Sequence, residues 1–159
     1  MIREAKPLDT DAIINLGVEH GKDAGLSISD SVDRSRIKEI YRKLLINPNV
    51  RIYVYEENGT IAGYVIGIVQ TKIWNDKQFG EIMLLFVHPE VRNRFVADNL
   101  MEYAVKFFKE KGCMFYMASS MHFDDEYKRS DEYCDRASKY FTKLQHMTMV
   151  GETFVKEIV

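Results

Sequence analysis

The chain has 159 residues and a formal net charge of −2; 46% of its residues are hydrophobic and 29% are charged. This balance is typical of one globular domain over residues 1–159 rather than a disordered chain, and the low net charge argues against direct nucleic-acid binding. No apolar run approaches the roughly 20 residues that span a bilayer, and the N-terminus lacks the apolar core of a signal peptide, so we expect a cytoplasmic protein with no membrane attachment.

The N-terminal third predicts one strand followed by two helices. Residues 1–6 suit a short strand at a sheet edge. Asp9 or Thr10 is predicted to cap a first helix, and Asp30 or Ser31 a second, because short polar side chains there precede apolar residues at helical spacing. The apolar sets are Ala12, Ile13, Leu16 and Gly17 in the first helix and Ile37, Ile40, Tyr41, Leu44 and Leu45 in the second.

Residues 51–70 predict a β-hairpin. Two runs rich in β-branched and aromatic residues flank Asn58-Gly59, which is a strong signal for a two-residue hairpin turn. Gly63 and Gly67 interrupt the second run. We therefore expect a bulge or a close approach of another part of the backbone there.

The segment from Phe79 to Gly112 predicts a strand, a turn and a helix. Residues 81–87 are an apolar run of strand length, typical of a strand buried on both faces, and His88-Pro89 ends it. Apolar residues then recur at helical spacing, at positions Ala97, Leu100, Met101, Ala104, Val105 and Phe108. Gly112 is well placed to end the helix in the left-handed conformation.

The C-terminal part predicts a further strand, a loop, a helix and a last strand. The strand is expected at residues 114–118, the polar loop at 119–131, and the last strand at 153–158, with a helix through Ala137 and Leu144 between them. The element order is then β-α-α-β-β-β-α-β-α-β. It predicts an α+β fold of the α/β three-layer type, with a mixed, mostly antiparallel twisted sheet of six to seven strands and helices on both faces.

The strand–turn–helix segment is suited to binding an anion, because the N–H groups of a helix's first turn point outward together. Its sequence resembles the GCN5-related N-acetyltransferases, whose signature is Gln/Arg-x-x-Gly-x-Gly/Ala after a strand that ends in a Val-x-Pro-like step. Here the strand ends in Val87-His88-Pro89, and the signature window reads Arg92-Asn93-Arg94-Phe95-Val96-Ala97. Phe95 stands where the family usually has its first glycine.

The resemblance implies an enzyme that transfers an acetyl group from acetyl-CoA to a primary amine by direct attack. In that family the backbone of the central strand holds the pantetheine arm, and the turn after it holds the pyrophosphate. The residues at these positions are Leu85, Phe86, Val87, Arg92, Asn93, Arg94, Phe95, Val96, Ala97 and Asp98. Phe95 is expected to leave less room for the ligand, and Asp98 to compete with a phosphate for the helix N–H groups.

Two residues are candidates for catalysis. Glu81 aligns with the catalytic glutamate of the histone-modifying branch and would take the amine proton; the alternative is a solvated charge at a strand end. The helix from Ala137 resembles the family's last helix, but the tyrosine that protonates the CoA thiolate falls on Phe141. The adjacent Tyr140 can replace it as general acid only if the helix register shifts.

Alternatives remain open. The departures at Phe95, Phe141 and Gln145 favour a non-catalytic binding or assembly module that keeps the fold with weakened or lost CoA binding, and an enzyme for longer acyl-CoA molecules would need a wider groove. The acceptor would be a small-molecule or protein amine, and an exposed sheet edge would allow a homodimer. No metal site is expected, because the histidines and the two cysteines lack partners at ligand spacing.

Overall fold

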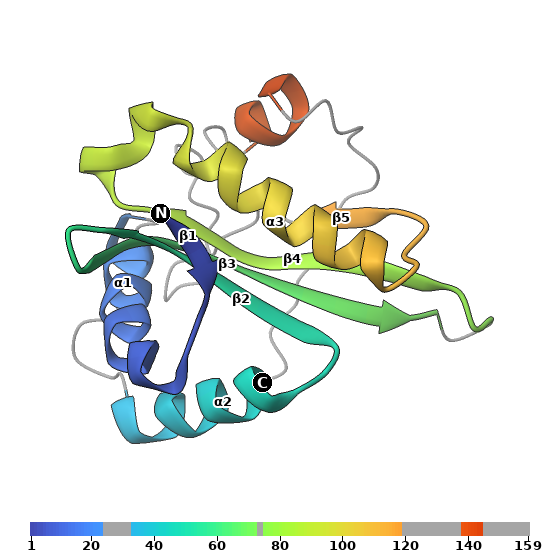
Figure 1. The fold of residues 1–159 in the computed structure, drawn as a ribbon, viewed down its shortest axis with the longest axis horizontal. Coiled ribbons are helices and arrows are strands. Elements are labelled where there is room, and N and C mark those ends of the chain that lie inside the picture. Colours follow the sequence, from blue (N-terminus) through green and yellow to red (C-terminus); the bar gives the residue numbers. More distant parts are fainter. Residues whose placement is uncertain (24–32, 73–74, 119–137, 145–159) are drawn as a thin grey trace, which may run out of the picture.

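The computed structural model describes residues 1–23, 33–72, 75–118 and 138–144, which form a sheet with helices on both faces (Figure 1). The sheet has the order β1-β2-β3-β4-β5 and is antiparallel except for the parallel pair β4–β5. Its strands are β1 (Ile2–Glu4), β2 (Val50–Glu57), β3 (Thr60–Thr71), β4 (Gln78–Val87) and β5 (Tyr116–Ala118). The helices are α1 (Thr10–Asp23), α2 (Arg34–Ile46) and α3 (Val96–Glu110), with short 3-10 helices η1 (Pro7–Asp9) and η3 (Pro89–Arg94) and a π-helix η4 (Tyr140–Leu144).

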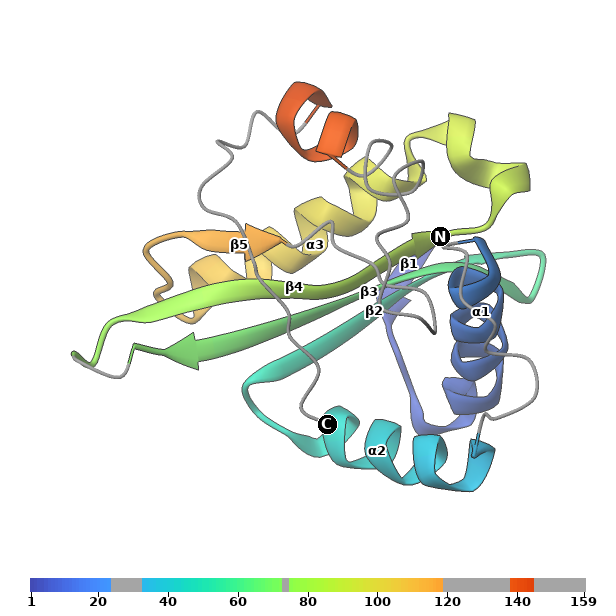
Figure 2. The ribbon, with the colours of Figure 1, turned by 180° about the vertical axis from the view of Figure 1, so that it is seen from behind.

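The helices divide the core into two layers, one on each face of the sheet (Figure 2). Helices α1 and α2 cover one face, where they bury apolar side chains of β2, β3 and β4 that include Ile52, Tyr64 and Phe86. Helix α3 covers the other face, and its Leu100 and Phe108 pack with side chains such as Val65. The three-layer α+β architecture predicted from the element order is confirmed.

The predicted hairpin is confirmed in detail. Asn58 and Gly59 both have positive φ angles, of 51° and 78°, as a two-residue hairpin turn requires. Both interior glycines of β3 lie beside close neighbours: a Cβ on Gly63 would lie 3.2 Å from the carbonyl oxygen of Phe86, and one on Gly67 would lie 3.0 Å from the Phe108 ring. The expectation of a close backbone or side-chain approach at these glycines is therefore correct.

Some predicted boundaries are wrong. The cap of α2 is Asp33 rather than Asp30 or Ser31, because its Oδ1 accepts the backbone N–H groups of Ser35 and Arg36 at 3.0 Å each. The Asp9 carboxylate does not face α1 as a cap but accepts the N–H of Lys6 and pairs with Arg3.

The sheet is described with five strands rather than six to seven, since the predicted strand at 153–158 lies outside the described residues. The polar loop predicted at 119–131 lies outside them as well. Strand β5 begins at Tyr116, two residues later than predicted, within the usual uncertainty of element ends.

Candidate active site

Strand β4 contains one more residue than the stretch of β3 that pairs with it. Gly67 of β3 pairs with Ile82, and the next residue back, Ile66, pairs with Leu84, so Met83 is a β-bulge with no partner of its own. Its side chain is 46% exposed, in the middle of a run predicted to be buried on both faces. The expectation of burial is wrong at this residue because a bulged residue does not follow the alternation of the pleat.

The bulge directly follows the part of β4 that pairs with β5. Within the described residues, β5 pairs in parallel with β4 from Gly80 to Ile82. Beyond the bulge, residues 84–87 pair with β3 on one edge, and no strand among the described residues pairs with their other edge. The N–H and C=O groups along that edge are placed as a strand presents them to an added strand.

The turn after β4 is a 3-10 helix rather than an irregular loop. His88 precedes it and accepts the Glu90 N–H on its ring nitrogen Nδ1 at 3.4 Å, and Pro89 occupies the first position. Arg92 folds back on the strand: its Nε donates to the Val87 carbonyl at 2.8 Å, and its guanidinium lies 5.6 Å from the centre of the Phe86 ring. Arg92 thus ties the turn to the end of β4.

Phe95 joins the turn to α3 in the left-handed conformation, with φ 56° and ψ 22°. This conformation is unfavourable for a residue with a Cβ and natural for glycine. The side chain is 74% exposed, so it points away from the core. The backbone therefore keeps the geometry that a glycine at this position would adopt, although the residue is an aromatic one.

The N-terminus of α3 presents backbone donors beside this turn. The first helical hydrogen bond runs from the N–H of Asn99 to the carbonyl of Phe95 at 3.0 Å. The N–H groups of Val96, Ala97 and Asp98 precede it, in the first turn of the helix. Phe95 provides no side-chain cap. Such a helix N-terminus suits a phosphate or another anion.

Tyr140 reaches this N-terminus from η4. Its hydroxyl donates to Oδ1 of Asp98 at 3.1 Å, and its ring packs edge-on against Phe141. The π-helical turn η4 begins at Tyr140. The role of Tyr140 as general acid, which requires a shift of the helix register before it, stays a prediction. Asp98, expected to compete with a phosphate, accepts a hydrogen bond from this tyrosine.

Glu81 lies two residues before the bulge, opposite Ile68 of β3 and Met117 of β5. Its carboxylate accepts a hydrogen bond from the side-chain amide of Gln70, on the adjacent strand. Glu81 is half-buried, so it is neither a core residue nor a fully solvated strand end. Gln70 was not foreseen from the sequence, because only the β3–β4 register brings it beside Glu81.

The predicted residues fall into two groups along one strand and its turn. Glu81 lies before the bulge, Leu85, Phe86 and Val87 lie on the edge after it, and the turn and the N-terminus of α3 follow. Phe86 and Val87 are buried and Leu85 is partly buried, so only their backbone groups are available at the edge. For Asn93 and Arg94 the structure describes the backbone alone. Met83, the residue that separates the groups, has no signal in the sequence.

The sequence and the structure are similar to known proteins. A model of the acetyltransferase (GNAT) family matches residues 23–130. No curated protein sequence matches the chain. Within the described ranges, every helix is too short or too polar to cross a membrane.

Solved structures share the fold over nearly their whole length. A predicted acetyltransferase from Clostridium acetobutylicum, solved with acetyl-CoA, has a TM-score of 0.76 at 14% identity, over 99% of this chain and 95% of that chain. Glucosamine-6-phosphate N-acetyltransferase from Arabidopsis thaliana has a TM-score of 0.73 at 18% identity, over 100% and 98%. An aminoglycoside acetyltransferase from an uncultured soil metagenomic sample, in complex with sisomicin, has a TM-score of 0.70 at 18% identity, over 99% and 96%.

Proposed function

Because the chain belongs to the acetyltransferase (GNAT) family and is therefore an acyltransferase, we propose that it transfers an acetyl group from acetyl-CoA to a primary amine by direct attack. The observation that carries this proposal is the bulge at Met83, after which the outer edge of β4 has no strand partner among the described residues. This edge leads to the N-terminus of α3, so one continuous stretch of backbone would bind the whole coenzyme.

The two ends of this stretch suit the two ends of the coenzyme. The pantetheine arm contains amides and would pair with residues 84–87 as an added strand pairs with a sheet edge. The pyrophosphate would accept hydrogen bonds from the N–H groups of Val96, Ala97 and Asp98. Phe95 supports this fit rather than opposing it, since its backbone already has the left-handed geometry and its ring is exposed.

The chemical step needs a proton acceptor beside the thioester. The neutral amine would attack the thioester carbon, an N–C bond would form and the C–S bond would break. Glu81, held by Gln70 just before the bulge, would take the proton from the amine directly or through a water molecule. Backbone N–H groups near the bulge would stabilise the oxyanion.

The CoA thiolate that leaves would need a proton. Tyr140 is the candidate donor among the described residues, and its hydroxyl lies in a hydrogen bond to Asp98 at 3.1 Å. Protonation of the thiolate by Tyr140 would require the hydroxyl to leave that bond and turn toward the sulfur.

The proposal specifies the acceptor substrate only as a primary amine. The similar structures include an enzyme named for a sugar phosphate amine and one solved with an aminoglycoside. Small-molecule amines of these two kinds are therefore the first to test, in the cytoplasmic setting that the sequence predicts.

The test is calorimetric titration with acetyl-CoA and free CoA, followed by an acetylation screen with glucosamine 6-phosphate and sisomicin among the amines. We expect micromolar binding, and a Glu81→Gln variant that binds acetyl-CoA equally well but turns over about 100-fold more slowly or worse. Glu102→Gln, a change of the same kind on the exposed face of α3, serves as the control. Absence of binding at millimolar acetyl-CoA would refute the proposal.

A further inference from the structure

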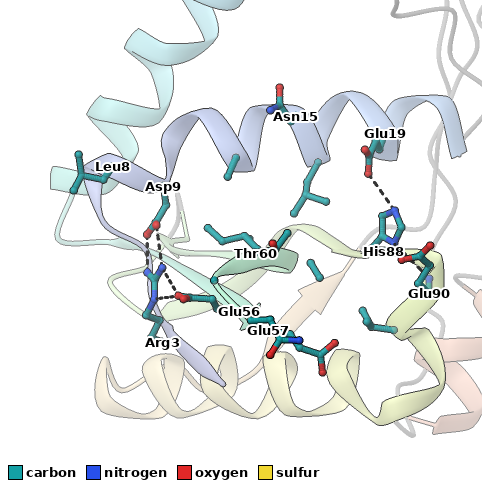
Figure 3. A pocket seen from close by; sticks show the side chains of 17 residues that line it. Arg3, Leu8, Asp9, Asn15, Glu19, Glu56, Glu57, Thr60, His88 and Glu90 are labelled. Atoms are coloured by element: carbon teal, nitrogen blue, oxygen red, sulfur yellow. Dashed lines mark hydrogen bonds and ion pairs between the residues drawn. The ribbon is translucent and has the colours of Figure 1, made fainter.

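A separate cavity lies between α1, the turn of the β2–β3 hairpin and the start of η3 (Figure 3). Its volume is about 780 Å³, within the roughly 300–1,000 Å³ of typical small-molecule sites. None of the residues proposed above for catalysis or coenzyme binding lines it. It approaches that site only through His88, Glu90 and Val91, at the start of the turn.

Part of the cavity wall is apolar and comes from three elements. Helix α1 supplies two residues, β3 two more, and η3 one. These residues are Ala12, Leu16, Ile61, Ala62 and Val91. They are the continuation of the core at this end of the sheet, and they offer a surface on which a hydrocarbon chain can lie out of water.

Five carboxylates line the cavity. Two of them, those of Asp9 and Glu56, bind the same cation, the guanidinium of Arg3. The Arg3 guanidinium bonds both oxygens of Asp9, at 2.6 and 2.9 Å, and its Nε donates to Glu56 at 2.7 Å. The guanidinium beside Asp9 holds the pKa of that carboxyl below its usual value, so both partners stay charged. Arg3 is thereby fully engaged with carboxylates of the wall.

The other three carboxylates stand on three different elements: Glu19 on α1, Glu57 at the end of β2 and Glu90 in η3. Glu19 and Glu90 lie on opposite sides of the His88 ring, 3.7 Å from Nε2 and 3.8 Å from Nδ1 (Figure 3). Glu57 accepts a hydrogen bond from the Tyr55 hydroxyl at 3.0 Å. Among the described residues, the wall thus contains five carboxylates and one guanidinium.

The separation of these carboxylates favours one kind of cation over others as the ligand of the cavity. Across the described part of the chain, no three acidic, histidine or cysteine side chains converge closely enough to hold a metal ion. Charges that stand apart with apolar surface between them fit a cation whose own charges are separated by methylene groups. We propose that the cavity binds an aliphatic oligoamine, with its ammonium groups at the carboxylates and its methylenes on the apolar wall.

Calorimetric titration with spermidine, at physiological ionic strength, tests this site. We expect saturable binding with one molecule per chain, weakened about tenfold or more in the triple variant Glu19→Gln, Glu57→Gln, Glu90→Gln, because three charge contacts are lost. The control is a triple variant with the same loss of charge on α2 and α3: Glu39→Gln, Glu102→Gln and Glu110→Gln. It should bind as the wild type does.

The remaining outcomes are each decisive. Absence of spermidine binding at millimolar concentration overturns the proposal, and so does an equal loss in both triple variants, which would show attraction by overall charge alone. Binding that Glu81→Gln abolishes while the cavity triple variant keeps it would place the amine at the proposed acceptor site instead. Tighter binding of Mg²⁺ than of spermidine would make the cavity a metal site. Titration in the absence of acetyl-CoA, compared between the cavity triple variant and Glu81→Gln, separates binding in this cavity from binding at the proposed acceptor site, so failure of one proposal is distinguishable from failure of the other.

Discussion

The two halves of β4, on either side of Met83, are built in different ways. The first half, residues 78–82, has β3 on one edge and β5 on the other, and its Gly80 lies directly under the Phe108 ring of α3. The second half, residues 84–87, keeps β3 but has no described strand on its outer edge. Among the described residues, the same strand is therefore packed between two strands in its first half and has no strand on its outer edge in its second half, which we call the open half.

The alternation of side chains explains how one extra residue separates these halves without disturbing the core. Ile82 packs in the α3 layer and Leu84 against the α1/α2 layer, and their partners Gly67 and Ile66 face the same two layers. If Met83 were absent, Ile82 and Leu84 would follow one another on alternate faces as in a regular strand. We therefore expect that the fold would form without the bulge and that the bulge serves function rather than stability.

Deletion of Met83 should give the largest effect on function. We expect the variant to fold, with a free energy of unfolding within about 1 kcal/mol of the wild type, since every pair with β3 stays in register. Acetyl transfer should fall about 100-fold, because the outer edge of β4 is redirected by an ångström or more. Chemical denaturation and steady-state kinetics measure the two effects.

Met83→Ala is the matched control for this deletion. It removes the exposed side chain and keeps the extra backbone residue, so it should be close to the wild type in both measurements. A deletion variant that acetylates as well as the wild type would contradict the role given to the bulge.

In the first half of β4, Gly80→Ala should lower stability. An added Cβ would lie 2.5 Å from atoms of the Phe108 ring, so the ring or α3 must move. Overpacking of this kind costs about 1–3 kcal/mol. Urea denaturation should show the loss, and acetyl-CoA affinity, measured well below the transition, should change little.

Gly67→Ala is the milder change to compare with Gly80→Ala, because its added Cβ would lie 3.0 Å from the Phe108 ring rather than 2.5 Å. Its loss of stability should be the smaller of the two. If Gly67→Ala were the more destabilising variant, the tight packing would have to lie elsewhere than under the first half of β4.

At the far end of the open half, Phe95→Gly should give the smallest effect, and a stabilising one. A left-handed conformation costs a residue with a Cβ roughly 1–2 kcal/mol, part of which glycine returns through the greater entropy of the unfolded chain. We therefore expect a gain of up to about 1 kcal/mol in the free energy of unfolding, and acetyl-CoA affinity that is unchanged or higher.

Phe95→Ala separates the ring from the backbone strain. It keeps the Cβ and hence the strain, so it should not be stabilised, although it also removes the exposed aromatic group. Lower acetyl-CoA affinity in both variants would show that the Phe95 ring itself contacts the coenzyme.

Local patterns were enough to predict much of the fold. The Asn58-Gly59 turn, the apolar spacing of α3 and the left-handed Gly112, with φ 73°, are all as predicted. Each depends on neighbours close in the sequence, through turn chemistry, helical period and the conformational freedom of glycine. The family signature at Arg92–Ala97 can also be read from residues that are neighbours in the sequence.

The sequence by itself determined the element order from β1 to β5, the hairpin, the strand–turn–helix segment and the family to which the chain belongs. Only the tertiary structure decided that Met83 is extra in its strand, that Gln70 holds Glu81, that Tyr140 bonds Asp98 and that carboxylates of α1, β2 and η3 share one cavity. The physical reason is register. A residue's partner across a sheet or between layers is set by how whole elements pair and pack, and a single extra residue, invisible in the local pattern, changes which backbone groups are left unpaired.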